Sequence, residues 1–218
     1  MTLSPFFPTA GQLPGTLPIF PLENALVLPR AELPLNIFEP RYLNMVSDAL
    51  ATHHLIGMVQ PQPRRAIGQP DLYNTGCAGR ITSYRETADG RIEIRLTGVC
   101  RFEITQELPS IRGYRIVEPN WQRFLADLDD AEETSAAQRE TLVGLTKRYL
   151  EAKNLTTDWQ LLERLSTLQL VHTLSIYMPF APLEKQAILE AQTLPERCMA
   201  LRSAMQFEIE GAGDSRPH

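Results

Sequence analysis

The spacing of the prolines between Leu17 and Pro40 constrains the fold of this chain more than any other feature. Pro21, Pro29 and Pro34 each lack a backbone N–H and fix φ, so the apolar runs between them are confined to edge strands and tight connections. Pro40 suits the first position of a helix, because its missing N–H would have no intrahelical partner there. This stretch therefore predicts three short strands followed by a helix, the strands being 17–20, 25–28 and 33–38.

The residues that follow Pro40 have the pattern of an amphipathic helix. Leu43, Val46 and Leu50 recur at intervals of three and four residues, which would place them on one face. Strands that lead directly into such a helix predict a barrel whose open end is plugged by the helix.

The next part of the chain is dominated by strand signals. Residues 54–60 form a continuous apolar run of strand length. Segments 77–87 and 91–98 flank a turn sequence, and alternation of apolar and polar residues over 92–97 makes this the clearest hairpin signal. Gly98 predicts a bend in the second hairpin strand. Residues 114–117 would form the last strand, ended by Pro119.

The pattern becomes helical in the C-terminal part. The acidic run 127–133 indicates a solvated linker or helix start, so we place the domain boundary nearby. Two leucine-rich stripes beyond it predict two long amphipathic helices, and Pro182 and Pro195 can each open a further one. The predicted fold class is α+β, with a β-rich domain over 1–123, a helical bundle over 124–211 and a disordered tail over 212–218.

Composition excludes several kinds of function. A net charge of −5 gives no overall attraction to nucleic acid. The N-terminus has no signal-peptide pattern, and no apolar run is long enough to span a membrane. The three cysteines, Cys77, Cys100 and Cys198, are far apart and lack CxxC spacing, which argues against disulfides or a zinc site. We expect a cytoplasmic protein that needs no metal ion or cofactor.

Several phrases of the sequence occur together in one known family. They are 17–22 (LPIFPL), 27–29 (VLP), 33–35 (LPL), 38–42 (FEPRY), 71–81, 98–102 and 184–186. In order and spacing they resemble the N-terminal substrate-recognition domain of the Lon protease family, and FEPRY looks most like its free-standing members. The resemblance implies a PUA-like pseudo-barrel and the binding of unfolded polypeptide or a partner protein, as in an adaptor for protein quality control.

Catalysis is not expected of this sequence. Full Lon proteases add an ATPase module and a serine–lysine peptidase module, but no GxxxxGK[ST] phosphate loop occurs here. The lysines, Lys147, Lys153 and Lys185, lie in helical stretches without a nucleophile motif. His172 lies beside a leucine stripe and is better explained by helix packing than as the base of a cryptic hydrolase. We assign no catalytic residue.

The residues around Pro40 are the candidate peptide-binding site. Glu39, Arg41 and Tyr42 lie where a strand meets the helix, and we place them at the rim of a peptide-binding surface, against the alternative of a local cap and ion pair. RNA binding is the second hypothesis, since Arg91, Arg95 and Arg101 would be able to share an outer face. The acidic net charge and the interspersed glutamates disfavour it.

The N-terminal arm, residues 1–15, is rich in proline and carries Phe6 and Phe7. Adjacent phenylalanines tend to be buried, either on their own barrel or on a partner. A homodimer in which the arm or the helical bundle packs across a two-fold axis is therefore a further hypothesis. Trp121 and Trp159 are expected to serve in packing.

Overall fold

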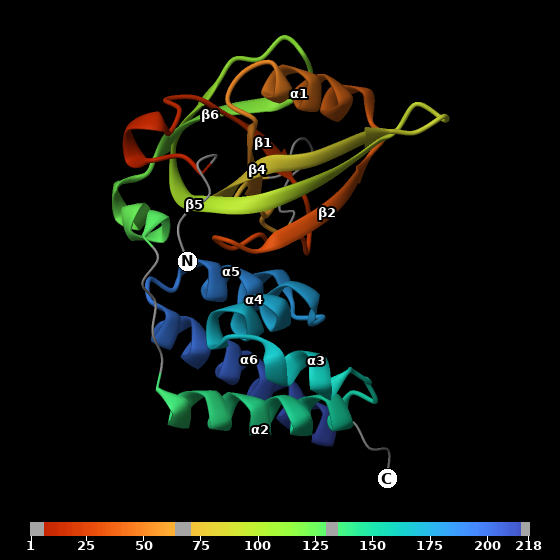
Figure 1. Ribbon diagram of the computed structural model, residues 1–218, viewed down its shortest axis with the longest axis vertical. Helices are drawn as coiled ribbons and strands as arrows, with labels where there is room; N and C mark the ends of the chain where they lie inside the picture. Colours follow the sequence, from red (N-terminus) through yellow and green to blue (C-terminus); the bar gives the residue numbers. More distant parts are fainter. Residues whose placement is uncertain (1–6, 64–70, 130–134, 215–218) are drawn as a thin grey trace. The chain divides into compact units, whose positions relative to one another are not determined.

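A computed structural model describes residues 7–63, 71–129 and 135–214. The chain divides into two compact units, Met1–Asp130 and Ala131–His218. The first contains the sheet and the second is helical (Figure 1). The mixed α+β class is thus as predicted. The division falls later than the expected boundary after Arg123, because the short helix η2 (Gln122–Leu128) contacts β5 of the first unit.

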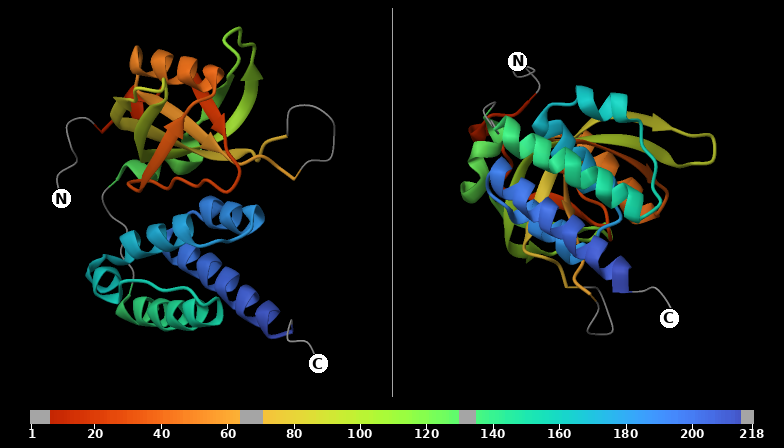
Figure 2. Two further views of the ribbon diagram at one scale, coloured as in Figure 1. Left: turned by 90° about the vertical axis from the view of Figure 1, so that its right-hand side faces the viewer. Right: turned by 90° about the horizontal axis from the view of Figure 1, so that it is seen from below.

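The first unit is built on one six-stranded sheet in the order β2-β5-β4-β3-β1-β6. An additional pairing of β5 with β6 closes five of these strands into a hydrogen-bonded ring, and β2 pairs with the first part of β5 outside it. The left view of Figure 2 shows these strands from a further direction. The β1–β3 pair is parallel and the other pairs are antiparallel. The strands are β1 (Leu17–Pro21), β2 (Glu32–Ile37), β3 (Leu55–Val59), β4 (Thr75–Glu86), β5 (Ile92–Leu108) and β6 (Arg115–Asn120).

Two of the three strands predicted from proline spacing form, namely β1 and β2. Residues 25–28 do not form a strand, although Leu28 is fully buried. The residues just after this segment bond to β5 at Gly98, where Gly98 N donates to Ala31 O (2.9 Å) and Arg30 N donates to Gly98 O (2.7 Å). Asn24 and Arg30, with φ of 62° and 65°, turn the chain on either side. The prolines therefore shape a buried connection here.

Helix α1 (Pro40–Leu50) begins at Pro40 as predicted. Its buried face consists of Tyr42, Met45, Val46 and Ala49, whereas Leu43 and Leu50 are only half-buried. The predicted stripe was therefore wrong in part. The reason is that α1 packs against β1 and β3 with the Tyr42 ring on Phe20, their ring centroids 4.2 Å apart. This contact turns Tyr42, and not Leu43, toward the sheet.

The predicted hairpin is present as β4 and β5, joined through Gly90 at φ +80°. Strand β5 continues through Gly98 as far as Leu108. Strand β6 includes Pro119, which was expected to end it, because the β5–β6 register shifts beside its partner Ile104 and tolerates the missing N–H.

The described part of the N-terminal arm packs on its own unit. Phe7 and Leu13 lie against the core of the sheet, and Trp121 Nε1 donates to Pro14 O at 3.1 Å. The guanidinium of Arg30 lies 5.8 Å from the centre of the Phe7 ring. Phe6 lies outside the described residues. The arm thus has a place in its own fold.

The start of the acidic run is not a solvated linker. Asp127 belongs to η2 and is 6% exposed, and Arg101, which was expected on an outer face, is 2% exposed. The two side chains form an ion pair between η2 and β5. Each would be costly to bury alone, so they are buried together.

The second unit contains five helices among its described residues. The second of the two predicted long helices is divided into α3 and α4, because Leu165 is extended and Ser166 caps a new helix by accepting from Gln169 N (3.2 Å). No described helix is both long and apolar enough to cross a membrane. The helices are α2 (Ala136–Ala152), α3 (Trp159–Arg164), α4 (Thr167–Tyr177), α5 (Pro182–Glu190) and α6 (Leu194–Asp214).

Helix α6 is longer than expected. Residues 212–214, predicted to belong to a disordered tail, are its last turn, and 215–218 lie outside the described residues. Glycine in a helix costs only about 1 kcal/mol relative to alanine, so glycines near its end do not stop it.

Buried cations cap the helices of the second unit. Lys185 Nζ donates to Ile176 O (3.2 Å) at the end of α4, and Arg197 donates to Ala191 O (3.4 Å) just beyond α5. Glu184 Oε2 accepts from Ala181 N (2.7 Å) at the start of α5. Glu184 and Lys185 of the phrase 184–186 therefore have a structural role in satisfying helix ends.

Candidate functional site

The three predicted site residues lie together at the start of α1. Arg41 Nε donates to Glu39 Oε2 at 3.0 Å, and both side chains are nearly half exposed. The Arg41 guanidinium lies over the Tyr42 ring, 4.6 Å from its centre. The two hypotheses for this stretch, a local ion pair and a peptide-binding surface, are therefore compatible, since the ion pair forms and still leaves Glu39 and Arg41 accessible.

Tyr42 differs from its two neighbours because it is only 7% exposed. Burial raises the pKa of its hydroxyl, and the nearby charge of Arg41 opposes that shift. Its ring supports Arg41 from beneath and does not itself present a surface. Phe38, by contrast, is 62% exposed one residue before Glu39. We therefore define the α1 rim as Phe38, Glu39 and Arg41.

Three arginines of the hairpin are paired with carboxylates. Arg85 pairs with Glu93, Arg91 with Asp89 and Arg95 with Glu32. A shallow depression, about 410 Å³ in volume, lies beside these ion pairs between β2, β4 and β5. Its charged groups already have partners, so it offers little electrostatic attraction for a polyanion.

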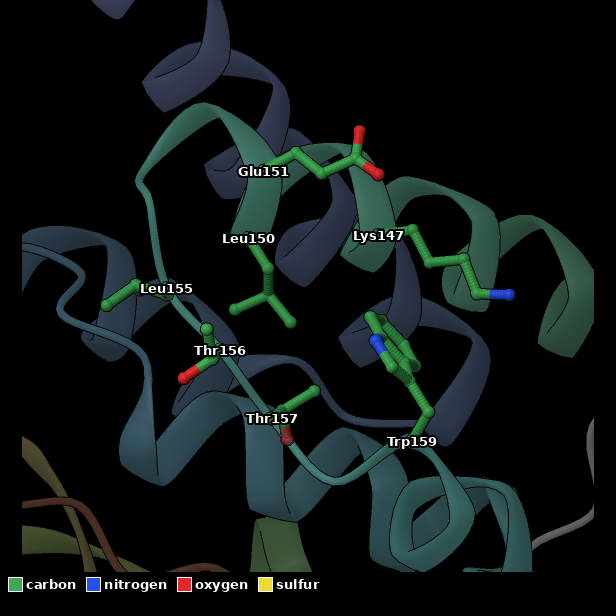
Figure 3. A pocket seen from close by; sticks show the side chains of 7 residues that line it. All are labelled: Lys147, Leu150, Glu151, Leu155, Thr156, Thr157 and Trp159. Atoms are coloured by element: carbon green, nitrogen blue, oxygen red, sulfur yellow. The ribbon is translucent and has the colours of Figure 1, made fainter.

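An open pocket of about 390 Å³ lies in the second unit, between α2 and α3. Figure 3 shows the side chains around it, with Leu150 at the centre and the Trp159 indole forming one wall. The residues that line it are Lys147, Leu150, Glu151, Leu155, Thr156, Thr157 and Trp159.

The turn that ends α2 builds this pocket. Asn154 has a positive φ of 53°, Asn154 N donates to Glu151 O (3.2 Å), and Leu155 N donates to Leu150 O (2.9 Å). This is the hydrogen-bond pattern of a Schellman motif, which brings the apolar residue after the turn next to the one in the last helical turn. Leu150 and Leu155 are brought together in this way.

Trp159 is fixed from the other side. Asp158 caps α3 by accepting from Gln160 N (3.0 Å) and Leu161 N (3.2 Å), which sets the position of the next residue, Trp159. The indole also packs against the core of the second unit, and Lys147 Nζ lies 5.2 Å from its centre. Trp159 was expected to serve in packing, and the pocket beside it was not predicted. The signal was Asn154, a residue type that tolerates positive φ at a helix end.

Several further residues carry side chains of kinds that take part in metal binding or catalysis. Among the described residues no three His, Cys, Asp or Glu side chains are arranged to hold a metal ion. Burial raises the pKa of the Cys100 thiol to about 12, so it is not a nucleophile near neutral pH. Burial is also the main cause that lowers the pKa of His53, in the turn that follows α1. His172 is buried on α4 within the helical core.

The chain matches one family profile and several known proteins. The profile of the ATP-dependent protease La (LON) substrate-binding domain matches residues 16–206. Lon protease of Flavobacterium johnsoniae is 26% identical over 208 residues, covering 91% of this chain and 25% of that protein. Lon protease of Parabacteroides distasonis is 34% identical over 94 residues, covering 42% of this chain and 11% of that protein. The chain thus spans at most about a quarter of these relatives.

Two solved structures have the same fold. The Lon N-terminal domain protein from Xanthomonas campestris has a TM-score of 0.62 at 23% identity, over 86% of this chain and 97% of that one. The N-terminal domain of Mycobacterium avium complex Lon protease has a TM-score of 0.60 at 16% identity, over 88% and 98%. At these identities the likeness concerns the fold.

Proposed function

This chain belongs to the ATP-dependent protease La (LON) substrate-binding domain family, and on that premise we propose that it is a non-enzymatic module that binds polypeptide. The observation that carries the proposal is the extent of the family match, since residues 16–206 include most of both units. We further propose that the strand ring is a PUA-like pseudo-barrel plugged by α1, and that the protein serves in the cytoplasm as an adaptor for protein quality control.

The α1 rim is the contact surface that we propose on the first unit. Phe38 offers an exposed apolar group beside a charged pair, Glu39 and Arg41. Aromatic and arginine side chains contribute most to protein interfaces, so this combination suits a peptide backbone with mixed side chains. Tyr42 contributes by holding the Arg41 guanidinium in place.

Polypeptide is favoured over RNA as the ligand because arginines that were candidates for RNA binding are paired with carboxylates. Arg85, Arg91 and Arg95 of the hairpin face carboxylates, and Arg101 is buried with Asp127. RNA binding relies on unpaired positive charge and exposed stacking residues. A titration with single-stranded RNA at low salt separates the two, since tight, salt-sensitive binding would favour the RNA hypothesis.

The binding test uses a permanently unfolded polypeptide, such as reduced and carboxymethylated α-lactalbumin, with the folded form as control. We expect the unfolded form alone to bind, and Arg41→Ala to weaken binding about fivefold. Arg85→Ala is the matched control, since it also removes the arginine of an exposed Arg–Glu pair. Equal binding by wild type and Arg41→Ala would remove the rim from the site, and absence of any binding would refute the proposed function.

The non-enzymatic proposal has its own test. The purified chain is incubated with ATP and casein, and both nucleotide and protein are followed. We expect neither hydrolysis nor cleavage, because no phosphate-binding loop or nucleophile motif occurs in the sequence. ATP-dependent degradation by the chain alone would overturn the proposal.

A homodimer remains part of the proposal, with the interface on the second unit. The described arm is already packed on its own sheet, whereas Phe207 of α6 is 70% exposed and Met199 of the same helix is 56% exposed. Sedimentation equilibrium of the full chain and of Phe207→Ser tests this. A monomer at all concentrations would exclude the dimer, and a dimer unaffected by Phe207→Ser would move the interface elsewhere.

A further inference from the structure

We infer that the α2–α3 pocket is a second polypeptide contact, which accepts one apolar side chain flanked by an acidic residue on one side and a basic residue on the other. The inference rests on the proposed function and extends it from the α1 rim to a separate site. It is carried by the three kinds of group that line the pocket.

The apolar groups determine what enters. Leu150 lies at the centre of the pocket with Leu155 and Trp159 on opposite sides of it, and Leu155 remains 40% exposed although it is part of a tight turn (Figure 3). A volume of about 390 Å³ is within the range of sites that hold small ligands. It therefore has room for a branched aliphatic side chain with part of its backbone. The hydroxyls of Thr156 and Thr157 add polar groups beside it.

The walls are already ordered without a ligand. The Schellman turn fixes Leu155, and the Asp158 cap with core packing behind the indole fixes Trp159. A preformed site loses less side-chain and loop entropy on binding. This explains how an exposed apolar surface can be held open instead of being closed by its own side chains.

The charges determine the flanks. Lys147 and Glu151 lie one helical turn apart on α2, yet no ion pair joins either of them to another residue in the described part of the chain. Lysine placed before glutamate is the weaker order for such a pair, and Figure 3 shows Lys147 directed along Trp159, away from Glu151. Lys147, which rests on the Trp159 ring without a carboxylate partner in the described part of the chain, and Glu151 attract a segment of opposite polarity, whereas a polyanion or polycation would be repelled by one of them.

The probe is a short extended peptide, Ac-Gly-Glu-Ala-Leu-Ala-Lys-Gly-NH2, in which the glutamate, leucine and lysine point to the same side of the strand. The full chain is labelled with 5-fluorotryptophan, which gives two 19F signals, since the sequence has two tryptophans. Trp121→Phe assigns them. We expect the peptide to shift the Trp159 signal alone, and a serine in place of its leucine to weaken binding about tenfold or more.

A charge exchange tests the flanks. Lys147→Glu makes both charges beside the α2–α3 pocket acidic. It should therefore weaken binding of the Glu/Lys peptide about two- to fivefold, and strengthen by a similar factor the binding of a peptide with lysine on both sides of its leucine. Arg148→Glu is the matched control, because Arg148 is exposed on the same helix and does not line the pocket. It should leave both affinities unchanged, which separates the local contact from the change in net charge.

The outcomes distinguish the inference from the proposed function. If the chain binds unfolded polypeptide but the peptide leaves the Trp159 signal unmoved, the pocket is not a contact and the α1 rim carries the function alone. If the serine peptide binds as well as the leucine peptide, the apolar assignment is wrong. Equal effects of Lys147→Glu and Arg148→Glu would refute the charged flanks.

Discussion

The carboxylate of Asp127 accepts hydrogen bonds from both the backbone N–H of Arg101 (2.9 Å) and its guanidinium (2.7 and 2.8 Å). Both side chains are 2% exposed, so the pair is inside the first unit. The same guanidinium lies 4.4 Å from the centre of the Phe124 ring. The pair therefore fixes η2 to strand β5 with its charges shielded from salt.

Asp127→Asn should destabilise the first unit by about 3–5 kcal/mol, because it leaves the Arg101 charge buried without its counter-ion. Glu103→Gln is the control, since Glu103 of β5 pairs with Arg123 of η2 between the same two elements but near the surface. It should cost about 1 kcal/mol or less. Urea unfolding followed by Trp121 fluorescence in a Trp159→Phe background measures both. Equal losses would show that the buried pair has no special role.

Helix α1 supports a second prediction. Val46 is fully buried, whereas Leu43 is only half-buried, so a charge is tolerated differently at the two sites. Val46→Asp should cost several kcal/mol and unfold the first unit near room temperature. Leu43→Asp should leave it folded with a lower midpoint, and Ser47→Asp, at an exposed position of the same helix, should change little. Thermal unfolding of the three variants tests this order, and its reversal would place the inner face elsewhere.

Local signals in the sequence predicted local structure well. Pro40 marked the first residue of α1 because a missing N–H at a helix start is a property of that residue alone. Apolar alternation likewise predicted the β4–β5 hairpin. Asp127 was misassigned because its partner Arg101 is 26 residues away, and composition alone makes both residues look solvated.

The candidate sites show the same limit. Glu39 and Arg41 were predictable as exposed neighbours at a helix start, since they are two residues apart and pair locally. The burial of Tyr42 was not, because it depends on Phe20 of β1. The α2–α3 pocket depends on the positive φ of Asn154, which a helical periodicity does not reveal.

Gly98 supports a third prediction. A Cβ atom at this position would lie 2.0 Å from Leu28 O, and that backbone cannot retreat easily because Arg30 N and Ala31 O are hydrogen-bonded to Gly98. Gly98→Ala should therefore destabilise the first unit by about 1–3 kcal/mol or more. Gly15→Ala, where nothing lies within 4 Å, is the control and should be nearly neutral. Urea unfolding compares them, and a neutral Gly98→Ala would mean that the 28–31 segment moves freely.

The last prediction concerns alkaline pH and Tyr114. Its hydroxyl donates to Asp48 Oδ2 at 2.7 Å, and burial, followed by this hydrogen bond and the Asp48 charge, raises its pKa from 10.0 to about 12. In the unfolded chain tyrosine ionises near its ordinary pKa, so between pH 10 and 12 the unfolded state loses its proton first. The stability that Tyr114 contributes is thus complete below about pH 10 and is lost as the pH rises toward 12. The raised pKa of Tyr42 acts in the same direction.

We expect Tyr114→Phe to be less stable than wild type at pH 8, since the hydrogen bond is gone, yet to lose less further stability by pH 11. Tyr84→Phe, which removes a tyrosine that is 54% exposed, should keep the wild-type slope. Urea midpoints at pH 8 and 11 decide between these outcomes, and parallel losses in wild type and Tyr114→Phe would show that the Tyr114 hydroxyl is not held in its neutral form by the fold.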